Sequence, residues 1–109
     1  MIELKTLARS SLFRYKGSIQ AGIEILYGKA SNKKVVSQET LESLLKTFSN
    51  KTVPIQTTRT IADLREGSLG YWLNKNISGP VITSYIAAIL VHEGYSELYK
   101  KELKFKIFQ

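Results

Sequence analysis

The chain contains no cysteine, one histidine (His92) and one aspartate (Asp63). The lack of cysteine excludes a disulfide framework, a thiolate nucleophile and zinc sites with cysteine ligands. A metal site built on His92 would need carboxylate partners, and the sequence shows none at a suitable spacing. We therefore expect no metal site and no cofactor.

Long apolar runs are absent as well. The longest candidate, Val81–Val91, contains the polar residues Thr83 and Ser84 and is too short to span a bilayer. Charged residues at positions 3, 5 and 9 leave no apolar core for a signal peptide. We expect a cytoplasmic protein that does not interact with a membrane.

The composition is that of a folded globule, with 43% apolar and 23% charged residues. A length of 109 residues predicts one domain that covers residues 1–109.

Basic residues are in excess. Sixteen Lys and Arg against nine Asp and Glu give a net charge of +7, which favours binding to phosphate polyanions or acidic proteins. Residues 1–34 carry seven basic and two acidic side chains, so the excess lies mainly in the N-terminal third. A solvated surface that only aids solubility would produce the same excess.

The N-terminal third has apolar residues at helical spacing. Residues 2–15 are consistent with a helix, although Leu12 is an equally suitable start for a strand. A second helix is predicted over residues 18–28, between a capping serine and a terminating glycine. Residues 29–34 (KASNKK) are interpreted as a basic loop, and residues 35–36 as a brief strand.

The middle of the chain predicts a helix that begins after Ser37 and ends near Asn50. Its apolar stripe consists of Leu41, Leu44, Leu45 and Phe48. The β-branched segment Thr52–Thr60 contains one proline and is typical of an edge strand or an extended connector. Residues 61–67 are interpreted as a helical turn or a loop.

The C-terminal part predicts a short helix after Ser68, a break at Gly79–Pro80 and a helix over Ile82–Glu93 that Gly94 ends. In the last segment, Leu103, Phe105 and Ile107 alternate with charged residues, as in a strand with one buried face. The fold class is therefore predicted to be α+β, with four to five helices and a short β-sheet that includes the C-terminal strand.

Residues 68–108 resemble winged helix-turn-helix domains. The matching features are the helix with Trp72, the turn over residues 77–80, the helix Ile82–Glu93 and the exit through Gly94 into a basic strand. The resemblance implies a winged-helix-like unit whose second helix enters the DNA major groove, followed by strands that form a wing.

The predicted second helix departs from this pattern, because base reading requires Arg, Lys, Asn or Gln on the exposed helix face. Its face away from the apolar stripe carries small, apolar and hydroxyl residues instead. We therefore predict a non-enzymatic accessory or regulatory domain that contacts the phosphate backbone with low sequence specificity. The predicted nucleic-acid-binding residues are Arg9, Arg14, Lys16, Lys33, Lys34, Lys75, Thr83, Ser84, Lys100, Lys104 and Lys106.

Two alternatives remain open. Phe13 and Tyr15 lie among the basic residues and could stack on bases, or they could be core aromatics. The chain could also be a protein-interaction module, an inhibitor or subunit, that docks on a partner or a second copy through the apolar helix face with Ala88, Val91 and Tyr95.

A nuclease is the remaining enzymatic hypothesis. Glu3-Leu4-Lys5 and Glu102-Leu103-Lys104 each match the Glu-x-Lys part of a metal-dependent nuclease site. Such a site also needs an aspartate placed by a strand, whereas Asp63 lies in a predicted turn or loop. We assign no catalytic residue.

Overall fold

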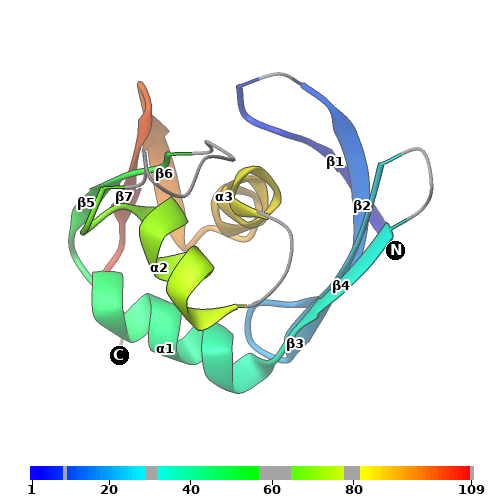
Figure 1. The fold of residues 1–109 in the computed structure, drawn as a ribbon, viewed down its shortest axis with the longest axis horizontal. Coiled ribbons are helices and arrows are strands. Elements are labelled where there is room, and N and C mark those ends of the chain that lie inside the picture. Colours follow the sequence, from blue (N-terminus) through cyan, green and yellow to red (C-terminus); the bar gives the residue numbers. More distant parts are fainter. Residues whose placement is uncertain (9, 29–31, 57–64, 78–81, 109) are drawn as a thin grey trace.

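The computed structural model describes residues 1–8, 10–28, 32–56, 65–77 and 82–108. These residues form seven strands and three helices in two antiparallel sheets (Figure 1). The elements are β1 (Ile2–Lys5), β2 (Leu12–Ser18), β3 (Gly22–Tyr27), β4 (Asn32–Val36), α1 (Gln38–Phe48), β5 (Thr52–Pro54), α2 (Leu69–Asn76), α3 (Thr83–His92), β6 (Ser96–Tyr99) and β7 (Glu102–Phe105).

The N-terminal third is a four-stranded meander in the order β1-β2-β3-β4. Phe13 and Tyr15 in β2 are buried while their neighbours in the strand are exposed, which is the period-two pattern of a sheet with one covered face. Gly17 and Gly22 adopt positive φ angles at the turn between β2 and β3. The turn therefore forms at backbone positions that other residues rarely occupy.

The helices predicted over residues 2–15 and 18–28 are therefore wrong, whereas the alternative of a strand that starts at Leu12 is confirmed by β2. Their apolar residues fit the helical and the strand period equally, and pairing between neighbouring strands decides for the sheet. Residues 32–34, predicted as loop, belong to β4, and the strand at residues 35–36 is confirmed as the end of β4.

The C-terminal part follows the prediction more closely. In α1, the Ser37 hydroxyl caps the helix by accepting a hydrogen bond from the Thr40 amide at 3.2 Å, and the predicted apolar stripe is buried. Ser68 caps α2 in the same way through the Tyr71 amide at 3.1 Å. The predicted edge strand is confirmed over Thr52–Pro54, because β5 is the outer strand of the order β5-β7-β6.

The predicted fold class needs correction. The described residues contain three helices and two antiparallel sheets, of four and three strands, in place of four to five helices with one short sheet. The difference arises in the N-terminal third, where the chain forms hairpins instead of helices. None of the helices within the described residues is long and apolar enough to cross a membrane.

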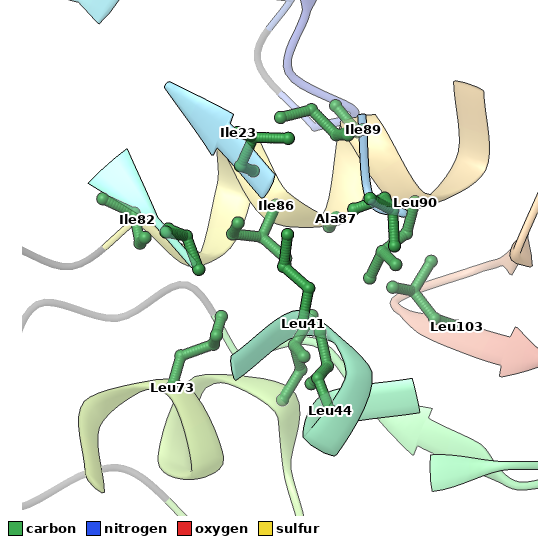
Figure 2. Packing of buried hydrophobic residues seen from close by; sticks show 14 of the residues in the cluster. Ile23, Leu41, Leu44, Leu73, Ile82, Ile86, Ala87, Ile89, Leu90 and Leu103 are labelled. Atoms are coloured by element: carbon green, nitrogen blue, oxygen red, sulfur yellow. The ribbon is translucent and has the colours of Figure 1, made fainter. Parts of the chain in front are cut away.

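Helix α3 lies between the two sheets (Figure 1). Figure 2 shows its side chains pointing to both sides, with Ile89 near Ile23 of β3 and Ile86 above Leu41 of α1. One hydrophobic cluster joins both sheets and all three helices. The six buried residues of α3 are Thr83, Ile86, Ala87, Ala88, Ile89 and Leu90.

Candidate nucleic-acid interface

The β1–β4 sheet has one face toward α3 and one face toward solvent. Because residues directly opposite on neighbouring strands share a face, the strand registers identify the solvent side. We call this side the outer sheet face. It consists of Glu3, Lys5, Leu12, Arg14, Lys16, Glu24, Leu26, Lys33 and Val35.

Four of these nine side chains are cations and two are carboxylates. Glu24 is 3.8 Å from the ammonium of Lys33, and it lies directly opposite Lys16. Lys5, Arg14 and Lys16 are exposed and form no ion pair within the described part of the chain. The face also exposes apolar side chains, with Leu12 at 60% and Val35 at 62% of their full exposure.

A pocket of about 250 Å³ lies beside this row of side chains. Glu3 and Arg14 line it from β1 and β2, and Leu12 and Leu26 provide apolar surface. Tyr27 also lines the pocket, and its ring packs against Tyr85 of α3 at a centroid distance of 4.9 Å. The pocket is therefore built on strands that are anchored to the core.

Glu93, which follows the last residue of α3, links the helix to the β1–β4 sheet by hydrogen bonds. The Tyr15 hydroxyl donates a hydrogen bond to Oε2 of Glu93 at 2.6 Å, and the Ile19 amide donates to Oε1 at 2.9 Å. Burial of Tyr15, followed by its hydrogen bond to Glu93 and the charge of that carboxylate, raises the pKa of Tyr15 well above its usual value. These contacts hold β2 and the following turn against the helix.

The structure separates the predicted nucleic-acid-binding residues. Arg14, Lys16 and Lys33 share the outer sheet face, whereas Lys34 is half-buried on the side of Ile25. Four further predicted residues are exposed and lie within residues 68–108: Lys75, Lys100, Lys104 and Lys106. Arg9 lies outside the described residues. The two sheets lie on opposite sides of α3 (Figure 1), so this helix separates the sheet that carries Arg14, Lys16 and Lys33 from the strand that carries Lys104.

The residues predicted on α3 are mostly not accessible. Thr83 and Ala88 are 1% and 4% exposed, and Ser84 is half-buried. Val91 and Tyr95 are also half-buried. The contacts of the β1–β4 sheet with α3 run through Tyr85 and through Glu93 at the helix end. Thr83 and Ala88 are buried and are therefore not available to a ligand.

Phe13 and Tyr15 are core aromatics, at 3% and 0% exposure, and are not free to stack on bases. Phe13 packs edge-on against Tyr85 at a centroid distance of 5.0 Å. Sequence reasoning missed Glu3, Leu12 and Leu26 as members of the site. The alternation of Phe13 and Tyr15 with Arg14 and Lys16 was the signal that could have placed the cations on one face.

The two Glu-x-Lys triplets lie in different sheets, one in β1 and one in β7. Asp63 lies outside the described residues. Among the residues that the structure describes, no group of three or more His, Asp or Glu side chains could hold a metal ion.

No protein-family model, curated protein or solved structure matches the chain.

Proposed function

We propose that the protein is a non-enzymatic nucleic-acid-binding domain, with an accessory or regulatory role, that contacts the phosphate backbone through the outer sheet face. One observation carries the proposal. Five of the seven basic residues of the N-terminal third and both of its acidic residues lie in strands of one sheet, and four of these cations project from its solvent side. Such a basic face attracts a polyanion.

The kind of contact follows from the side chains. Lys5 and Lys16 are flexible point charges that neutralise phosphates without reading sequence, and Arg14 can hold a phosphate by two parallel hydrogen bonds. Since Phe13 and Tyr15 are buried, the face has no aromatic platform for continuous base stacking. Backbone contacts should therefore supply most of the affinity.

The winged-helix resemblance remains part of the proposal in a reduced form. The succession of α2, α3 and the β6–β7 hairpin supports it. Lys100 at the hairpin turn lies 5.6 Å from the ring centroid of the exposed Tyr99, and this tip is suited to a second, smaller backbone contact. Because α3 is buried, we do not assign base reading to it.

The test compares two double variants that remove the same charge from opposite sides of the molecule. Fluorescence anisotropy of a labelled single strand and a labelled duplex is measured between about 50 and 200 mM salt. For the single strand, we expect Lys5→Ala with Lys16→Ala to reduce the slope of log K against log salt by about 1.4, the effect of two lost phosphate contacts. Lys100→Ala with Lys104→Ala is the matched control and should change the slope less.

The proposal would be wrong if the unmodified protein bound with an affinity that does not change with salt. It would also be wrong if the protein did not bind at low salt. A larger loss in the hairpin variant would contradict the assignment to the outer sheet face and move the contact to the β6–β7 hairpin. Circular dichroism of each variant checks that the fold is retained.

A further inference from the structure

The pocket beside the outer sheet face is small. Its volume of about 250 Å³ is below the range of about 300–1,000 Å³ that holds drug-sized ligands. Leu12 and Leu26 contribute apolar atoms to a lining that is mostly polar, and two charged side chains contribute hydrogen-bonding groups. A small planar heterocycle meets both conditions.

The two charged side chains, Glu3 and Arg14, lie directly opposite each other on β1 and β2. Directly opposed residues have their Cβ atoms about 4.5–5.5 Å apart, so both groups reach the same pocket. Neither side chain makes an ion pair or hydrogen bond with any other residue that the structure describes. The carboxylate and the guanidinium therefore keep their full hydrogen-bonding capacity for a ligand.

We propose that this pocket binds a single unpaired guanine base. Guanine presents O6 and N7 as adjacent acceptors, which a guanidinium such as that of Arg14 contacts by two hydrogen bonds. It also presents N1–H and N2–H as adjacent donors, which match the two oxygens of the Glu3 carboxylate. The other bases lack one of these two matched pairs.

The base must be unpaired, because N1–H and N2–H are occupied by cytosine in a duplex. Recognition of Watson–Crick edges is typical of proteins that bind single-stranded segments, loops or ends. The inference rests on the proposed function, in which Lys5 and Lys16 hold the flanking phosphates. It adds to that function a preference for one base within a backbone-dominated contact.

The test uses labelled thymidine oligonucleotides that carry either no guanine or one central guanine. We expect the guanine to raise the affinity at least about tenfold, since one well-placed bidentate contact alone has this effect and the pocket offers two. Inosine, which lacks the N2 amino group, and 7-deazaguanine, which lacks N7, should each lose most of this gain. The two analogues thus examine the contacts of Glu3 and Arg14 separately.

Glu3→Gln separates base recognition from net charge. It should remove the gain from guanine while the affinity for the thymidine oligonucleotide stays equal or rises, because a negative charge is lost. Glu24→Gln is the matched control, since it removes the same charge from the same face outside the pocket lining. This control should keep the guanine preference.

The outcomes distinguish this inference from the proposed function. Salt-dependent binding with equal affinity for both oligonucleotides would overturn the guanine site and leave the backbone contact intact. If neither oligonucleotide binds, GMP is titrated against labelled protein by NMR. Shifts confined to Glu3, Arg14 and their neighbours would keep the pocket and reject the backbone contact, and the absence of shifts would reject both.

Discussion

At the scale of single residues, Gly17 and Gly67 offer a direct comparison of backbone strain and steric conflict. Both have a φ of +90°, which is unfavourable for any residue with a Cβ atom. A Cβ at Gly17 would collide with the carbonyl oxygen of Gly22 across the β2–β3 turn, whereas a Cβ at Gly67 would meet no atom within 4 Å. The two positions therefore differ in surroundings and not in φ.

We expect Gly17→Ala to reduce the free energy of unfolding by about 3 kcal/mol, since the turn must shift in addition to bearing the strain. Gly67→Ala should cost about 1 kcal/mol, from backbone strain alone. Urea denaturation followed by circular dichroism measures both values. Equal losses would show that the close approach to Gly22 is not a constraint on the hairpin.

Tyr15 makes the free energy of unfolding depend on pH in the alkaline range. Its pKa is raised from an ordinary value of 10.0, first by burial and then by the hydrogen bond and charge of Glu93. Above pH 10 the unfolded chain releases this phenolic proton while the folded protein keeps it. The stabilisation is therefore complete below pH 10 and is lost as the pH rises further.

We expect the free energy of unfolding to fall above pH 10 by up to about 1.4 kcal/mol for each pH unit through this residue. Tyr15→Phe has no phenolic proton, so its unfolding free energy should depend less steeply on pH in the same window. Urea titrations at a series of pH values measure both slopes. Parallel slopes for the two proteins would exclude Tyr15 as the titrating group.

At the scale of secondary structure elements, α3 was predicted as a helix with one apolar stripe and an open opposite face. The two sheets lie on opposite sides of this helix (Figure 1), and six of its ten residues are buried. Ala88 illustrates the consequence. A small residue at this position permits close packing of the helix, and a charge there would be buried without a partner.

Ala88→Glu should therefore destabilise the protein by about 3–5 kcal/mol, the range for an uncompensated buried charge. His92→Glu places the same side chain at an exposed position on the same helix and should change stability by less than about 1 kcal/mol. Thermal unfolding of both variants makes the comparison. If Ala88→Glu were as stable as the unmodified protein, the burial of this position in the folded protein would be wrong.

The sequence was sufficient to predict the helices that carry local signals. Ser37 and Ser68 cap α1 and α2, and Gly94, with a φ of +84°, ends α3. The N-terminal third could not be predicted, because Ile19 and Ile23 fit a helix while Ile23 and Ile25 fit a strand equally well. The choice between the two depends on pairing with neighbouring strands and on packing against α3, which no local pattern contains.

The same reason limited the prediction of the candidate site. The count of basic residues identified the N-terminal third as the cationic part of the chain. The strand register decides which cations share a face of the sheet. In this register Arg14 lies opposite Glu3 on the outer sheet face, whereas Lys34 lies opposite Ile25 on the other face. Thr83 was assigned to a phosphate contact because the sequence could not reveal that this residue is buried in the folded protein.

At the scale of the whole molecule, both sheets depend on the helix between them. Ile89 of α3 faces Ile23 of the β1–β4 sheet, and Leu90 lies near Leu103 of the other sheet (Figure 2). If either sheet detached, a largely apolar helix face would become exposed to water, and each detached sheet would lose most of its buried surface. The free energy of this exposure couples the two halves.

We therefore expect the protein to unfold in one cooperative transition. Trp72, the only tryptophan, reports on α2 by fluorescence, and the amide of Ile25, fully buried in β3, reports on the β1–β4 sheet by hydrogen exchange. Both should give the same free energy of unfolding when they are measured in the same buffer. A lower value for Ile25 would mean that the sheet opens while α2 stays folded. The β1–β4 sheet would then unfold independently of α2. Ligand binding to the outer sheet face would slow hydrogen exchange at Ile25 without raising the unfolding free energy that Trp72 fluorescence reports.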